Sequence, residues 1–109
     1  MERRRHRRVS KQVKSVLQAN SHEVEGETLD LSISGARIAS SLVVQPGRQL
    51  AVKLIIPGDD TPILIERARV QWTVDSTFGV RFVDLQQREL DELEQLIGES
   101  LAIDEGSQA

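Results

Sequence analysis

The sequence contains no cysteine, which excludes a disulfide framework, a thiol nucleophile and a cysteine-ligated zinc site. It also lacks any apolar run near the roughly 18 residues that a membrane-spanning helix requires. The basic start at residues 1–8 is not followed by the apolar stretch of a secretory signal. We therefore expect a cytoplasmic protein with no membrane span.

Residues that commonly carry catalysis or bind metals are scarce. The two histidines, His6 and His22, have no second histidine at metal-ligand spacing, so no metal site is expected. No Gly-x-Ser-x-Gly nucleophile motif is present. Asp59 and Asp60 follow a Pro-Gly pair, which is typical of a solvated turn. We therefore expect a protein that is not an enzyme and needs no cofactor.

Charge is distributed unevenly along the chain. The formal net charge is -3. Residues 1–14 nevertheless hold one carboxylate, Glu2, and seven basic side chains, which are Arg3, Arg4, Arg5, Arg7, Arg8, Lys11 and Lys14. The rest of the chain is net acidic and is a poor platform for nucleic acid. We predict that residues 1–11 form a flexible basic arm for an anionic partner.

The middle of the chain shows the period-two alternation of apolar residues that indicates β-strands. Strands are predicted at 12–19, 23–33, 36–40, 50–56, 63–74 and 78–83. A phase change in the alternation near Glu66-Arg67 predicts a β-bulge. The side chains predicted to point inwards are Leu29, Leu31, Ile33, Leu50, Val52, Leu54, Ile56, Ala68, Val70, Trp72, Val74, Phe78, Val80 and Phe82.

After the last strand the apolar spacing changes to three and four residues, which predicts an amphipathic helix at 86–99. Asp84 is its predicted N-cap, and residues 104–109 are predicted to be a disordered tail. Six or so short antiparallel strands followed by one helix predict a mainly β fold, a small barrel at 12–83 capped by the helix. The length suits one domain, expected at 1–103.

Two short motifs have a spacing that bears on ligand binding. Arg4 and Arg8 form Arg-x-x-x-Arg, and Asp30, Ser32 and Gly35 form Asp-x-Ser-x-x-Gly. Each motif alone is common, because any arginine-rich arm contains the first and any strand end with a glycine bulge resembles the second. Their combination, in this order and ahead of these strands, is much more specific.

With these motifs, the strands 68–72 (ARVQW) and 78–82 (FGVRF) and the closing helix, the chain resembles the PilZ domain over residues 2 to about 103. PilZ domains are bacterial receptor modules for cyclic di-GMP. The resemblance implies a six-stranded antiparallel β-barrel whose outer surface holds the ligand, clamped by the N-terminal arm. It also implies a bacterial cytoplasmic protein.

The resemblance assigns a role to each motif residue. Arg4 and Arg8 would pair with phosphate oxygens or with guanine, as an arginine fork can do. Asp30 would accept hydrogen bonds from the N1 and N2 donors of guanine. Ser32 would bind a phosphate or a guanine edge, and Gly35 would let the backbone turn close to the ligand.

Further arm and barrel residues are candidates of the same kind. Arg3 precedes the first motif, and an arginine there is associated in the family with two intercalated cyclic di-GMP molecules, so two ligands per chain are expected. Arg5 and Ser34 are lesser candidates. Trp72 is another, and it either packs in the core or rim or stacks on a guanine. Arg7 stands where family members often carry proline.

Two alternatives to a ligand-switched receptor stay open. The chain could be a small nucleic-acid-binding β-barrel that uses its arm, although its net acidity and few aromatic residues argue against this. It could also be a PilZ-like protein-interaction module that binds no ligand, against which the intact motifs count. In the favoured interpretation the arm changes conformation on binding and regulates an unidentified protein partner or fused domain.

Arg37 and Arg69 would help to bind phosphates only if they share the ligand's face.

Overall fold

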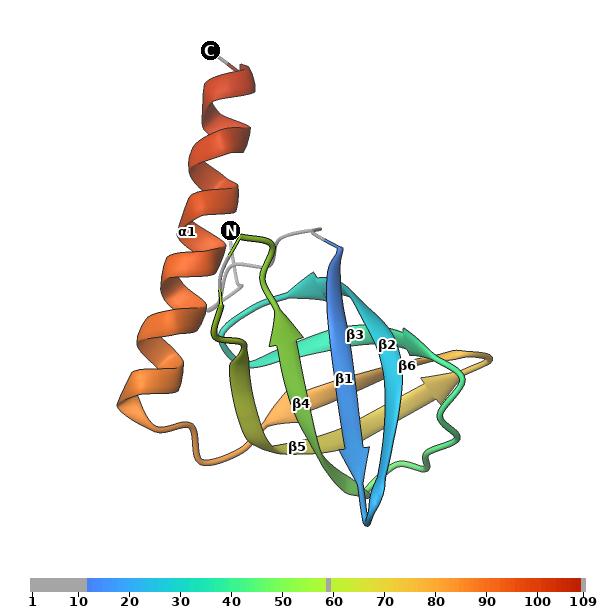
Figure 1. The fold of residues 1–109 in the computed structure, drawn as a ribbon. Coiled ribbons are helices and arrows are strands. Elements are labelled where there is room, and N and C mark those ends of the chain that lie inside the picture. The colour runs from blue at the N-terminus through green and yellow to red at the C-terminus, as the bar shows by residue number, and fades with distance from the viewer. Residues whose placement is uncertain (1–11, 59, 109) are drawn as a thin grey trace, which may run out of the picture.

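The computed structural model describes residues 12–58 and 60–108, with side chains up to residue 98. It forms six strands and one helix (Figure 1): β1 (Val13–Ala19), β2 (His22–Leu31), β3 (Gly35–Ser40), β4 (Gln49–Ile55), β5 (Ile63–Val74), β6 (Thr77–Phe82) and α1 (Gln87–Gln108). All neighbouring strands pair antiparallel, and they close into a barrel in the order β1-β2-β3-β6-β5-β4. The predicted fold class is confirmed. Among the described residues, no helix is both long and apolar enough to cross a membrane.

Alternation fills the barrel interior as predicted on β4 and β6. Leu50, Val52 and Leu54 are buried, as are the three predicted residues of β6, while Ile56 is only half-buried. The largest fully buried side chain is Phe78. Outside the barrel, α1 packs next to β5 (Figure 1) and buries three apolar side chains, which are Leu93, Leu96 and Ile97.

One polar pair lies inside this apolar core. Ser15 and Thr28 are both fully buried, and their hydroxyl oxygens lie 2.8 Å apart across β1 and β2. The Ser15 hydroxyl also lies 3.0 Å from the carbonyl oxygen of Val13, to which it can donate. These hydrogen bonds supply the partners that buried hydroxyl groups need.

Three β-bulges interrupt the alternation. The predicted bulge at Glu66-Arg67 is confirmed, because Ile65 pairs with Val52 and Ala68 with Leu50, so β5 holds one residue more than β4 there. A second extra residue lies at Leu29 in β2, and a third lies at Gln71 in β5. The alternation of apolar residues in the sequence does not predict the second and third bulges.

The bulges at Leu29 and Gln71 show that several predicted inward positions are wrong. Leu29 is half-buried, because the bulge shifts the inward position to Thr28, and Ile33 lies in the turn after β2. After the bulge at Gln71, the side chains of β5 that were predicted to point inwards point outwards. Trp72 is therefore 40% exposed and Val74 is 58% exposed, and neither belongs to the core.

The helix begins and ends later than predicted. It runs to Gln108, past the predicted end at residue 99, and its backbone includes most of the segment predicted to be a disordered tail. No proline, the residue that most strongly breaks a helix interior, interrupts the sequence there. Asp84 is not the N-cap, because its carboxylate pairs with Arg67 at 3.1 Å. Gln86 takes that position instead: its backbone N–H donates to the Glu89 carboxylate at 2.8 Å, as in a capping box.

Candidate functional site

The two unpredicted bulges bring Asp30 and Trp72 to the outer face of the barrel in one row. Asp30 lies opposite Arg37, Arg37 opposite Gly79, and Gly79 opposite Trp72, across β2, β3, β6 and β5. Residues that face each other in an antiparallel pair project from the same side of the sheet. Without the bulge at Leu29, Asp30 would follow the alternation to the inner face.

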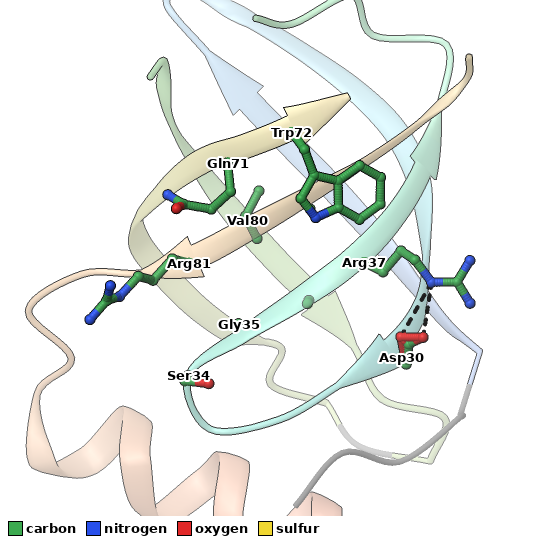
Figure 2. Close-up of a pocket in the computed structure, with 10 residues that line it drawn as sticks. Asp30, Ser34, Gly35, Arg37, Gln71, Trp72, Val80 and Arg81 are labelled. Carbon is green, nitrogen blue, oxygen red and sulfur yellow. Dashed lines mark hydrogen bonds and ion pairs between the residues drawn. The ribbon is translucent and has the colours of Figure 1, made fainter. Parts of the chain in front are cut away.

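Two glycines leave this part of the outer face without side chains, Gly79 within the row and Gly35 two residues before Arg37 on β3. At Gly35 an added Cβ would collide with the carbonyl oxygen of Val80, so β3 approaches the backbone of β6 more closely than any other residue allows. At Gly79 an added Cβ would collide with the indole of Trp72. The indole thus lies directly over Gly79, and in Figure 2 it is drawn across β6.

Gly35 and Gly79, here called the glycine floor, form an open hollow together with the side chains around them. The hollow has a volume of about 660 Å³. This volume lies within the range of small-molecule sites, roughly 300–1,000 Å³. The hollow combines one carboxylate, two guanidinium groups and one aromatic face (Figure 2). Its lining residues are Asp30, Ser34, Gly35, Ala36, Arg37, Gln71, Trp72, Gly79, Val80 and Arg81.

Asp30 and Arg37 form an ion pair at the hollow. The Arg37 Nε–H donates to both carboxylate oxygens of Asp30, at 2.9 Å to Oδ2 and 3.4 Å to Oδ1. The Asp30 side chain is only 14% exposed, whereas that of Arg37 is 45% exposed. The carboxylate is therefore held in place but still reaches the surface.

Ser32 does not line the hollow. It is buried, and its hydroxyl lies within the turn between β2 and β3, where it accepts from the backbone N–H of Ser34 at 3.2 Å and lies 3.0 Å from the Ser34 hydroxyl. The Ser32 backbone N–H donates to the carbonyl of Gly35 at 2.9 Å. Ser32 thus shapes the turn that presents Ser34 and Gly35, and a direct ligand contact by Ser32 stays a prediction.

The structure brings together four of the candidate residues, Asp30, Ser34, Gly35 and Trp72. The arm candidates lie outside the described residues; these are Arg3, Arg4, Arg5 and Arg8. Three further residues line the hollow that the sequence did not predict as candidates, Gln71, Gly79 and Arg81. The FGVRF segment contained Gly79 and Arg81, but only the strand register shows that they face the hollow.

Replacing Gly79 by alanine should displace the Trp72 indole from the surface of the barrel. The cost should be about 1–3 kcal/mol of unfolding free energy, as for other overpacked positions. Trp72 is the only tryptophan, so its fluorescence emission should shift to longer wavelength as the ring enters water. In a Trp72→Ala background the same glycine change should cost much less stability. Equal costs in both backgrounds would contradict the packing of the indole on Gly79.

The chain is similar to known proteins in sequence pattern and in fold. The family model of the PilZ domain matches residues 2–99, and no curated protein matches the sequence significantly. The inhibitor of motility MotI/DgrA of Bacillus subtilis is 19% identical with a TM-score of 0.75, covering 94% of this chain and 53% of that one. YcgR of Escherichia coli, solved in complex with cyclic di-GMP, is 16% identical with a TM-score of 0.77, covering 98% of this chain and 50% of that one.

A third similar structure is the PilZ domain of CeSA from a cellulose-synthesising bacterium. It is 14% identical with a TM-score of 0.68, covering 90% of this chain and 98% of that one. The chain therefore spans about half the length of MotI and YcgR, but nearly all of the isolated CeSA domain. At these identities the likeness shows the fold, a closed six-stranded barrel followed by a helix.

Proposed function

Since the chain belongs to the PilZ domain family, we propose that it is a receptor for cyclic di-GMP that binds its ligand in the hollow on the outer barrel face. PilZ domains are ligand-binding modules rather than enzymes. The observation that supports this proposal best is the row Asp30, Arg37, Gly79 and Trp72 on the outer face, above a glycine floor.

The chemistry of the hollow suits a guanine nucleotide. The carboxylate of Asp30 can accept the N1–H and N2–H donors of a guanine, a pair that adenine does not present. The exposed side of Trp72 offers an aromatic face for a base. The guanidinium groups of Arg37 and Arg81 favour phosphate oxygens nearby. Complexed YcgR shows that a protein of this fold can bind cyclic di-GMP.

The basic arm supplies the remaining cations in this proposal. Arg4 and Arg8 bind phosphate or guanine, Arg3 and Arg5 add charge, and the arm changes conformation when it closes over the ligand. We further propose two stacked ligands per chain, because Arg3 offsets the repulsion between four phosphates and can itself stack on a guanine. The arm's movement then regulates a protein partner or a fused domain.

Titration of the chain with cyclic di-GMP should give saturable binding heat with about two ligands per chain. GTP and cyclic di-AMP at the same concentrations should give little, because the first lacks the cyclic geometry and the second lacks the guanine donors. A short single-stranded RNA serves as the further comparison. No heat with cyclic di-GMP and a folded protein would refute the receptor, and salt-dependent RNA binding alone would favour the nucleic-acid alternative.

A further inference from the structure

Two arginines face each other on the outer surface of β5 and β6. Arg69 lies opposite Arg81 in the strand register. Both are exposed, and each lies between two buried neighbours in its strand, so both side chains project outwards. Residues that face each other in an antiparallel pair have Cβ atoms about 5 Å apart. The backbone therefore holds the roots of two positively charged side chains next to each other.

Neither member of this arginine pair is neutralised in the part of the chain that the structure describes. No carboxylate there pairs with Arg69 or Arg81. Arg37 and Arg67, by contrast, each form an ion pair with an aspartate. Like charges directly opposite each other destabilise a sheet. An anion that contacted both guanidinium groups would offset this repulsion.

The arginine pair lies at one end of the hollow. Arg81 lines the hollow and lies opposite Gly35 in β3. In Figure 2 its guanidinium is on the side away from Trp72 and Arg37. Arg81 follows Gly79, the residue under the Trp72 indole, by two positions in β6, which corresponds to about 7 Å along the strand. One nucleotide can span this separation, with its base on the indole and its phosphate at the arginines.

We propose, on the basis of the proposed function, that Arg69 and Arg81 together bind one phosphate group of the ligand. A guanidinium group can donate two parallel N–H groups to phosphate oxygens. Two such groups on adjacent strands can hold one phosphate between them, and the phosphate then offsets their mutual repulsion. Arg69 does not line the hollow itself, so the binding site extends beyond the hollow onto β5.

Single replacements measure the contribution of each arginine. Arg69→Gln and Arg81→Gln should each weaken cyclic di-GMP binding about tenfold in calorimetric titrations, as expected for the loss of a charge-assisted hydrogen bond. Without ligand, both variants should melt at the native temperature or slightly above it, because the repulsion is gone. Arg67→Gln is the matched control, since Arg67 lies on the same strand but pairs with Asp84. The control should bind cyclic di-GMP like the native chain.

A double variant tests whether the two arginines act on the same phosphate. Arg69→Gln combined with Arg81→Gln should lose clearly less affinity than the product of the two single losses. After either replacement the phosphate is no longer held against the remaining arginine, so removing the second arginine costs less. Phosphorus NMR of the complexes identifies the group that is bound. In both single variants a phosphorus signal of the bound ligand should move towards its position in the free ligand.

Four results would overturn the proposal. Native affinity in either single variant would place that arginine outside the binding site. An equal loss in the Arg67→Gln control would reduce the pair to a general attraction for anions. Single losses that multiply in the double variant would mean that the two arginines bind different groups. Phosphorus signals that stay at their native positions would mean that the arginines contact another part of the ligand.

Failure of the proposed function gives a different result. In each of the four cases above, the native chain still binds cyclic di-GMP. If the native chain itself did not bind cyclic di-GMP, the receptor function would be refuted, and the phosphate role of the arginine pair with it.

Discussion

Replacing Asp30 by alanine should weaken cyclic di-GMP binding ten- to a hundredfold and leave the melting temperature almost unchanged. Loss of a hydrogen bond to a charged group costs about 1.5–3 kcal/mol, which corresponds to that change in affinity. The effect on stability should be small because Arg37, with which Asp30 forms an ion pair, is nearly half exposed. An ion pair of this kind contributes only a few tenths of a kcal/mol to about 1 kcal/mol.

Glu27→Ala is the matched control for Asp30→Ala. It removes one carboxylate from the same strand, and Glu27 does not line the hollow. Calorimetric titration and thermal unfolding of both variants measure the two effects. If Asp30→Ala bound as tightly as the Glu27 control, the carboxylate would play no part in recognition. If it melted far below the control, Asp30 would be a structural residue.

Gly35→Ala should destabilise the barrel by about 3 kcal/mol or more, which is larger than the usual cost of overpacking. The added Cβ would meet the carbonyl oxygen of Val80, a backbone atom that cannot turn aside as a side chain can. Relief requires β3 and β6 to separate, and the pairs around Gly35 hold them together. For a domain of this size the melting temperature should fall by about 10 °C or more.

Alanine substitutions at two other glycines provide reference values for the loss of stability in Gly35→Ala. Gly98 lies in α1 with nothing near an added Cβ, so Gly98→Ala should leave stability unchanged or raise it by up to about 1 kcal/mol. Gly79→Ala, where only the Trp72 side chain obstructs, should fall between the two. Thermal unfolding followed by circular dichroism gives the order. A Gly35→Ala variant as stable as the Gly98 variant would show that β3 does not approach β6 as closely as described.

The strands and one of the three bulges were predictable from the sequence. At Glu66-Arg67 two consecutive charged residues break the alternation, so the extra residue is visible as a phase change. The other two bulges have no such signal. Thr28 is polar but buried, because it has the Ser15 hydroxyl as a partner. Trp72 and Val74 are apolar but lie outside. Polarity alone therefore predicts the wrong face of the barrel for Thr28 in β2 and for Trp72 and Val74 in β5.

The candidate site was predictable in part for the same reason. The motif named Asp30 and Gly35, and the structure places both at the hollow. Gly35 has a further role that the sequence did not predict, because its missing side chain makes room for the backbone of β6. Its close approach to a ligand stays a prediction. The alignment of Arg37 and Gly79 with Asp30 depends on which residues face each other across four strands. That register depends on how all the strands pair in the closed barrel, so it cannot be predicted from any one segment of the sequence.

The pairing of β3 with β6 also has a consequence for how the chain folds. These strands are separated in sequence by β4 and β5, so their contact forms only after a long loop closes, which makes such pairings slow. The floor of the hollow belongs to these two strands and does not exist until they meet. On the proposed function, cyclic di-GMP binds the completed barrel and no partly folded form. At a concentration one hundred times its dissociation constant, cyclic di-GMP would add about 2.7 kcal/mol to the free energy of unfolding. Since proteases cleave the unfolded chain, the concentration of this second messenger in the cell would also set how much of the receptor escapes proteolysis.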